Sequence, residues 1–250
     1  MTNVLRYAMA GLLLTAGMFA GRSEAGVIIN GTRVVYPAQN KEVTVKLTNQ
    51  GEKPALVQVW LDDGDEKSTP DTAKVPFIVM PPIFRMEPSK GQAVRLLYTK
   101  APLPTDKESL FWLNLLEVPP KSDNPEGRNL LQFAFRTRIK VFFRPAGLAG
   151  EPASAANQLT WKLVTGKDGK GVAMQASNPT PYYVSFAAVS MKVGDHSYDT
   201  ETHGGMVAPG GTSSFEIKQL TSRPSGEVTA EFSVISDYGA LNPMSQPVSL

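Results

Sequence analysis

The residues best suited to binding chemistry lie in one segment, LLQFAFRTRIKVFFRP, at residues 130–145. Its odd-numbered positions are nearly all apolar, and its even-numbered positions carry Arg136, Arg138, Lys140 and Arg144. Successive side chains of a strand point to opposite faces, so this alternation predicts a long β-strand with one apolar and one cationic face. Such a strand can complete the sheet of a partner protein as well as its own.

Residue types that carry catalysis or bind metals are few in this sequence. There is no cysteine, which excludes thiol catalysis, thiolate metal sites and redox chemistry of cysteine. The two histidines, His196 and His203, lie in a polar, loop-like stretch without a second ligand at a suitable spacing. The acidic residues between Asp62 and Glu66 lack the spacing of an EF-hand loop and are interpreted as a solvated hairpin tip. We therefore expect no enzyme, no metal and no cofactor.

The first 25 residues have the features of an export signal. Arg6 precedes an apolar stretch, and Ser23-Glu24-Ala25 places small residues at the positions that a signal peptidase reads. The apolar stretch is shorter than the roughly 20 residues that span a bilayer, and no later stretch is long enough. We predict that residues 1–25 are a cleaved signal peptide, so that the mature chain begins at Gly26.

The predicted mature chain is almost neutral. Removal of Arg6, Arg22 and Glu24 from the 25 basic and 23 acidic residues leaves a net charge of +1. This balance gives no reason to expect binding to nucleic acid or to an anionic membrane surface.

Short runs rich in β-branched and aromatic residues recur along the chain, separated by Pro, Gly, Asn and Asp. This pattern predicts an all-β fold built from β-sandwiches. The strand pattern lapses in AGLAGEPASAAN, at residues 146–157, where small residues and Pro favour irregular backbone. We therefore predict two immunoglobulin-like domains, at 26–146 and 157–250, joined by a linker at 147–156.

The motif LPTDKESLFWLNLLEVPP, at residues 103–120, resembles the signature of the periplasmic pilus chaperones of the chaperone–usher pathway. It has an acidic and a basic residue, Glu-Ser, apolar and aromatic residues around Asn, and a double Pro. Four further segments resemble other parts of that family in the same order: TRVVY at 32–36, PPIFRMEP at 81–88, the strand at 130–145 and NPTPYYV at 178–184. Together these segments cover most of the predicted mature chain.

The resemblance implies a periplasmic, boomerang-shaped protein that binds immature pilus subunits and escorts them to an outer-membrane usher. In the family, an Arg of the first strand and a Lys of the seventh strand, G1, grip the subunit's C-terminal carboxylate between the domains. Arg33 and Lys140 match these positions. Arg offers a planar fork and Lys a compact charge, and the two repel without an anion, so we expect both to stay solvated in the free protein. From the residues alone, both could be ordinary surface charges.

The family also lends strand G1 to the unpaired sheet edge of a subunit. Leu131, Phe133 and Phe135 would then fill the groove of that subunit. The same alternation also permits these residues to fill the domain's own core. Lys140 has the opposite parity, so a regular strand would point it to the other face. We predict a bulge or strong twist between Arg136 and Ile139 that reconciles the two faces.

A third set implied by the resemblance is Glu108, Arg144 and Asp237, which match an ion network that fixes the angle between the domains. An Arg between two carboxylates can satisfy both, although such residues taken alone would be interpreted as surface charges. The connection from Pro119 to Arg128 is short and lacks cysteine. It resembles the branch of the family with a short F1–G1 loop, which builds rod-like pili.

Two other classes of protein fit the sequence less well. A structural pilus subunit or adhesin usually carries an N-terminal donor extension and a disulfide, which this sequence lacks. A carbohydrate-binding sandwich needs exposed aromatic residues, whereas Trp60, Trp112 and Trp161 are interpreted as core residues. The chaperone interpretation is preferred, with self-association of the free form expected because its apolar strand is uncovered.

Overall fold

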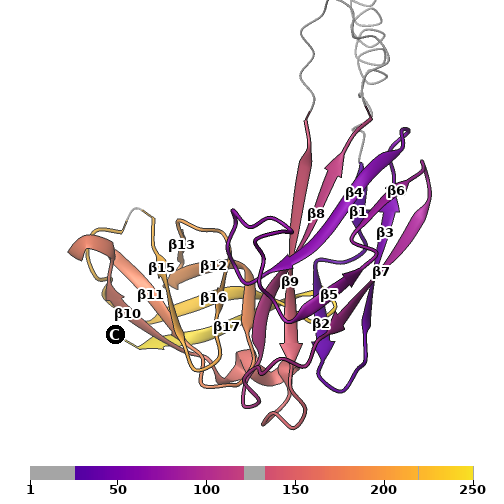
Figure 1. Ribbon diagram of the computed structural model, residues 1–250. Coiled ribbons are helices and arrows are strands. Elements are labelled where there is room, and N and C mark those ends of the chain that lie inside the picture. The colour runs from indigo at the N-terminus through magenta and orange to yellow at the C-terminus, as the bar shows by residue number, and fades with distance from the viewer. Residues whose placement is uncertain (1–25, 121–132, 219, 250) are drawn as a thin grey trace, which may run out of the picture.

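A computed structural model describes residues 26–120, 133–218 and 220–249. These residues form two β-sandwiches, which confirms the predicted all-β, immunoglobulin-like fold (Figure 1). Leu131 and most of the connection from Pro119 to Arg128 lie outside the described residues, as do residues 1–25. No helix among the described residues is long and apolar enough to cross a membrane.

Within residues 26–120 and 133–144, the first sandwich contains nine strands in two sheets. Their bounds are β1 (Val27–Ile29), β2 (Arg33–Pro37), β3 (Val43–Asn49), β4 (Ala55–Asp62), β5 (Phe77–Met80), β6 (Ile83–Met86), β7 (Gly91–Tyr98), β8 (Ser109–Val118) and β9 (Phe135–Arg144). One sheet has the order β1-β3-β7-β5, and the other has the order β2-β9-β8-β4-β6. Strand β2 pairs with β9 in parallel, whereas β8 pairs with β9 antiparallel.

The core of the first sandwich lies between these sheets and is built from alternate residues of each strand. Tyr36, Val57, Leu113 and Val141 are fully buried there. The ring of Tyr36 lies 5.9 Å from that of Phe143, measured between centroids. These contacts fix which face of β2 and β9 points inward, so the intervening residues of both strands must point outward.

The other eight strands of the described part of the chain belong to the second sandwich. They are β10 (Thr160–Thr165), β11 (Val172–Ser177), β12 (Val184–Val193), β13 (His196–Asp199), β14 (Gly205–Val207), β15 (Thr212–Glu216), β16 (Val228–Ile235) and β17 (Leu241–Ser249). They are joined by hydrogen bonds into one sheet with the order β13-β12-β16-β17-β10-β11-β15, in which β14 also pairs with β12. Its core centres on Trp161, whose ring packs on Phe186, Phe215 and Phe232.

The segment between the sandwiches contains a short 3-10 helix, η2 (Pro152–Gln158). A second one, η3 (Lys167–Gly169), follows β10. Ala155 and Ala156 of η2 are buried in the second core, so their small side chains bring this segment against the domain. Figure 1 shows the strands of the two sandwiches running at a marked angle to one another, with β2, β9 and β16 near the junction.

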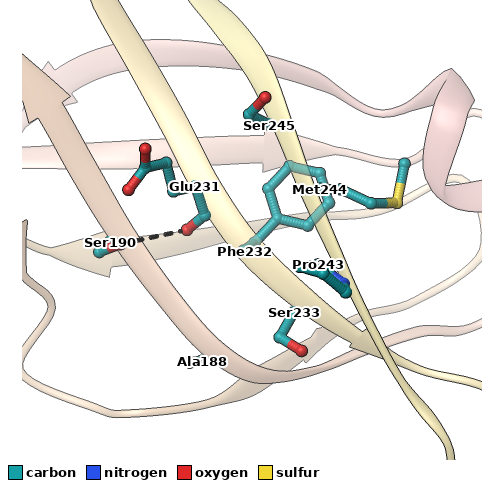
Figure 2. Close-up of a pocket in the computed structure, with 8 residues that line it drawn as sticks. All are labelled: Ala188, Ser190, Glu231, Phe232, Ser233, Pro243, Met244 and Ser245. Carbon is teal, nitrogen blue, oxygen red and sulfur yellow. Dashed lines mark hydrogen bonds between the residues drawn. The ribbon is translucent and has the colours of Figure 1, made fainter.

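The outer face of the second sandwich has a shallow depression of about 530 Å³ (Figure 2). Most of its side chains are small, as in Ala188 and Ser190. The Ser190 hydroxyl donates a hydrogen bond of 3.4 Å to the carbonyl oxygen of Glu231. The Glu231 carboxylate lies 3.8 Å from the ammonium of Lys192. These polar groups pair with one another, and the depression contains no arrangement suited to catalysis.

Candidate functional site

Arg33 and Lys140 lie directly opposite each other in the ladder between β2 and β9. The structure thus brings together the two cations that the sequence singled out. The register follows from core packing, because Tyr36 and Phe143 form an inward-facing pair three residues further along. Arg33 and Lys140 therefore lie on the outer face of the five-stranded sheet, at its junction with the second sandwich.

Neither cation is neutralised. Arg33 donates one hydrogen bond of 3.0 Å from Nη1 to the carbonyl oxygen of Ile235, and its Nε is buried without a partner. Within the described residues, neither Arg33 nor Lys140 has a carboxylate within salt-bridge distance. Buried donors are rarely left unsatisfied, so this arrangement has capacity for an anion.

The two cations are half-buried, so the expectation that they stay solvated is wrong. Arg33 lies where the two domains meet, since it binds the carbonyl oxygen of Ile235, and Lys140 lies beside it in the strand pair. Burial lowers the pKa of Arg33, and Asp237 partly opposes this effect. Burial also lowers the pKa of Lys140, and the neighbouring charge of Arg33 lowers it further. In both cases burial is the larger cause, and it disfavours the charged form of the side chain.

A cavity of about 310 Å³ lies between the domains beside this pair. Arg33, Phe142 and Arg144 line it from the first domain, and Tyr183 and Ser185 are among the lining residues of the second. The Ser185 hydroxyl is buried and has no hydrogen-bond partner within the described residues. Lys140 is not among the lining residues.

Glu108, Arg144 and Asp237 are brought together at the same junction. Arg144 Nε lies 2.6 Å from Glu108 Oε1, and Nη1 and Nη2 lie 2.7 and 2.9 Å from the two carboxylate oxygens of Asp237. Glu108 itself reaches the second domain, because its Oε2 accepts a 2.7 Å hydrogen bond from the backbone N–H of Tyr183. Although burial opposes the effect, the two carboxylates raise the pKa of Arg144 and keep it charged.

The N-terminal half of β9 forms an open sheet edge. Strand β8 pairs with β9 from Phe135 to Phe143, but β2 pairs only with residues from Lys140 onward. On the side of β2, Phe135–Ile139 therefore has no neighbouring strand within the described residues. Figure 1 shows β8 and β9 running together well beyond the end of β2.

Two of the predicted groove-binding residues lie at this open edge. Phe133 is 61% exposed and Phe135 is 64% exposed, and their rings lie 6.5 Å apart. They are therefore not sealed in the domain's own core, which was the alternative that the sequence left open. The third residue, Leu131, lies outside the described residues.

Of the bulge or strong twist predicted between Arg136 and Ile139, the bulge is wrong, and the twist stays a prediction. Strands β8 and β9 pair without a register shift from Phe135 to Phe143. Regular alternation therefore places Phe135 and Lys140 on opposite faces. Arg136 and Arg138 are held on the outer face by hydrogen bonds to the side-chain oxygen of Asn114, at 2.9 and 3.0 Å, which maintains the alternation.

Asp62 corrects the interpretation of the acidic segment as a solvated hairpin tip. Its side chain is fully buried, and it accepts hydrogen bonds from Arg138 Nη2 at 2.6 Å, Asn114 Nδ2 at 2.7 Å and the Gly64 N–H at 2.8 Å. Burial alone would raise the pKa of Asp62, but these hydrogen bonds outweigh it and hold the pKa below its ordinary value. Asp63, Asp65 and Glu66 are exposed, as expected for a hairpin tip. The described residues contain no cluster of His and acidic residues that could hold a metal ion.

Trp60 and Trp112 were interpreted as core residues. Trp60 is indeed buried and Trp112 is partly buried, but both lie on the outer face of the sheet and outside the core between the two sheets. The guanidinium carbon of Arg136 lies 4.8 Å from the ring centre of Trp60, and that of Arg138 lies 4.8 Å from the ring centre of Trp112. The alternation of each strand already indicates the outer face, and this signal was missed in the sequence. Trp60 alternates with the core residues of β4 instead of falling in step with them. Trp161 does lie in a core, that of the second domain.

Comparison with known protein families gives one match for each sandwich. The model described as "Pili and flagellar-assembly chaperone, PapD N-terminal domain" matches residues 26–149. The model described as "Pili assembly chaperone PapD, C-terminal domain" matches residues 154–246.

Individual proteins and structures give the same result. The chaperone protein FimB/FhaD of Bordetella pertussis is 39% identical over 234 residues, which cover 92% of this chain and 91% of that protein. The crystal structure of the Pseudomonas aeruginosa CupB2 chaperone is 41% identical with a TM-score of 0.74, covering 89% of this chain and all of that one. A structure of the Salmonella enterica SafA pilin in complex with the SafB chaperone is 30% identical with a TM-score of 0.72, covering 89% of this chain and 96% of the matched chain.

Proposed function

Since the chain belongs to the PapD family of pilus assembly chaperones, which are not enzymes, we propose that it binds pilus subunits in the periplasm and delivers them to an outer-membrane usher. The pilin bound to the SafB chaperone supports this class of partner. Removal of residues 1–25 as a signal peptide would release the chain into the periplasm. The domain matches give no support to a structural pilus subunit or a carbohydrate-binding protein.

Donation of β9 is the central step of the proposed mechanism. The observation that carries it is the open edge at Phe135–Ile139, with Phe133 and Phe135 exposed beside it. An incomplete subunit would pair its backbone with this edge, and the apolar side chains would enter its groove. Each buried side chain contributes about 1.5–3 kcal/mol, from which the cost of association and ordering is subtracted. Leu131 would extend the same set, and self-association of the free form stays a prediction.

The C-terminal carboxylate of the subunit would bind Arg33 and Lys140. Among the described residues, neither cation has a carboxylate within salt-bridge distance, and the Arg33 guanidinium also has an unused buried donor. An anion there would relieve the repulsion between them and form charge-assisted hydrogen bonds. Because Lys140 and Phe135 belong to one strand, anchoring the chain end at Lys140 would set the register of pairing further along β9. Lys140 and Phe135 point to opposite faces of β9. Both could still contact one subunit, because the subunit would pair with the edge of β9, which lies between the two faces.

The network of Glu108, Arg144 and Asp237 would fix the angle between the domains. Arg144 contacts a carboxylate from each domain, and Glu108 also binds the backbone of Tyr183 in the second domain. Such buried ion networks constrain geometry more reliably than they add stability. The carboxylate site would thereby keep its shape when no subunit is bound.

Co-expression of the exported protein with a candidate pilus subunit tests this proposal. Wild-type protein should allow recovery of the subunit from the periplasm, whereas Arg33→Ala and Lys140→Ala should reduce the recovery strongly. Lys46→Ala is the matched control, because Lys46 is an exposed strand lysine of the same domain. Unchanged recovery with both cleft variants would show that they do not anchor the subunit.

A further inference from the structure

Both cations of the proposed anchor lie against aromatic rings. The Arg33 guanidinium carbon is 5.7 Å from the ring centre of Phe142, and the Lys140 ammonium is 5.7 Å from the ring centre of Trp112. Arg144, at the same junction, also lies near a ring, with its guanidinium carbon 5.4 Å from the ring centre of Tyr182, but it is bound by the carboxylates of Glu108 and Asp237 as well. Cations of this region are thus held in two ways: Arg144 has a ring and carboxylates, whereas Arg33 and Lys140 have a ring and no carboxylate within salt-bridge distance among the described residues.

The two ways differ in what they leave for a ligand. A carboxylate holds a cation and cancels its charge, so an incoming anion must compete with it. The face of an aromatic ring attracts a cation through its quadrupole but adds no net negative charge. A cation held on a ring is therefore kept in place with its full charge available.

The strand registers show how Trp112 comes to hold Lys140. Asp62 of β4 pairs with Trp112 of β8, Trp112 pairs with Lys140 of β9, and Lys140 pairs with Arg33 of β2. These four residues form one row across the outer face of the sheet. In this row, Trp112 lies between Asp62, whose carboxylate is buried, and Lys140.

The carboxylate of Asp62 binds two residues of the next row of the sheet, Asn114 of β8 and Arg138 of β9. Arg138 lies 2.6 Å from Asp62 Oδ1, and its guanidinium carbon is 4.8 Å from the same Trp112 ring that Lys140 contacts. The Trp112 ring therefore contacts two cations. Arg138 forms an ion pair with the Asp62 carboxylate, whereas Lys140 does not. The arrangement separates a structural cation from one that remains free for a ligand.

We propose that Trp112 is a positioning residue for the subunit anchor: its ring holds the Lys140 ammonium at the domain junction and separates it from Asp62. This inference rests on the proposed function, since it concerns the carboxylate that Arg33 and Lys140 would bind. Trp112 itself does not contact the subunit carboxylate. Its replacement should therefore affect recognition of the carboxylate more than pairing along β9.

A pair of peptides separates these two contributions. The probe is a synthetic peptide that copies the C-terminal strand of the subunit recovered in the co-expression test, made once with a free carboxylate and once with a C-terminal amide. The ratio of the two dissociation constants measures recognition of the carboxylate alone. For the wild type we expect the amide to bind about 10-fold more weakly or worse, as for loss of a charge-assisted hydrogen bond.

The ratio should fall towards one in Lys140→Ala and should fall several-fold in Trp112→Leu. Trp60→Leu is the matched control, because Trp60 is an outer-face indole that stacks with Arg136 and not with Lys140. Its ratio should stay at the wild-type value. Should Trp112→Leu fail to fold, Trp112→Phe retains a smaller ring and should give an intermediate ratio.

Two different failures can be told apart. If Lys140→Ala leaves the ratio unchanged, the proposed carboxylate anchor is wrong and the role of Trp112 falls with it. If Lys140→Ala lowers the ratio but the folded Trp112 variants keep the wild-type value, or weaken both peptides equally, the anchor stands and the positioning role of Trp112 is overturned.

Discussion

Arg33 of β2 and Lys140 of β9 face each other across one rung of a parallel strand pair, and no carboxylate within the described residues pairs with either. Two half-buried like charges at this spacing oppose folding, because each is partly desolvated and repels the other. A protein that keeps such a pair bears a stability cost in its free form. In the proposed function, the carboxylate of a bound subunit removes that cost.

Replacing Lys140 with Met should therefore stabilise the free protein. Burial and Arg33 both lower the pKa of Lys140, which shows that its charged form is disfavoured in the folded state. We expect the free energy of unfolding to rise by about 0.5–1 kcal/mol, measured by urea denaturation at neutral pH. Lys46→Met, at an exposed position, should change it by less than about 0.5 kcal/mol. A clear loss of stability in Lys140→Met would contradict this account of the pair.

Phe135→Asp should abolish retention of a co-expressed subunit without unfolding the chaperone. The side chain is 64% exposed, so the free energy of unfolding should change by less than about 0.5 kcal/mol. Val141→Asp is the contrasting variant on the same face of β9, because Val141 is fully buried and a charge there should prevent folding. Retention of the subunit by Phe135→Asp would argue against a role of this side chain in a groove.

Arg144→Met should destabilise the protein by about 3–5 kcal/mol, because it leaves the buried carboxylate of Glu108 without its partner. Thermal and urea unfolding measure this loss, and small-angle X-ray scattering should show a wider range of interdomain geometries. The control is Arg85→Met, which removes an exposed ion pair with Glu87 and should have almost no effect. Equal effects of the two substitutions would mean that the network does not hold the domains together.

Asp62 should make the stability depend on pH below about 4. Its folded-state pKa lies below the ordinary value of about 3.9, so its contribution is complete above that value and is lost as the pH falls through the folded-state pKa. Urea denaturation of wild-type protein and Asp62→Asn from pH 7 to pH 3 measures this contribution as their difference. The difference should favour the wild type at pH 7 and shrink below about pH 4. A difference that stays constant would exclude linkage through Asp62.

Period-two alternation was sufficient to predict β9 and the all-β fold, because β-strands expose alternate residues to different environments. The lapse of the strand pattern at residues 146–157 then predicted two sandwiches, and the resemblance to the pilus chaperones singled out Arg33 and Lys140. The row from Asp62 to Arg33 was beyond reach, since it depends on the registers of four strands that are far apart in the sequence. Trp112 was assigned to a core because a large aromatic residue within a strand pattern is usually buried there. The absence of the predicted bulge also depends on contacts between strands far apart in the sequence. Asn114 of β8 binds Arg136 and Arg138 and so keeps the even-numbered residues of β9 on the outer face.

Amide hydrogen exchange along β9 tests the central claim most directly. In the free protein, the amides of Phe135–Ile139 that point away from β8 lack a strand partner and should exchange quickly. Addition of a pilus subunit should slow their exchange strongly, while Lys140–Arg144, already paired with β2, should change little. Protection that appears elsewhere on the chaperone and leaves Phe135–Ile139 unchanged would contradict donation of this strand.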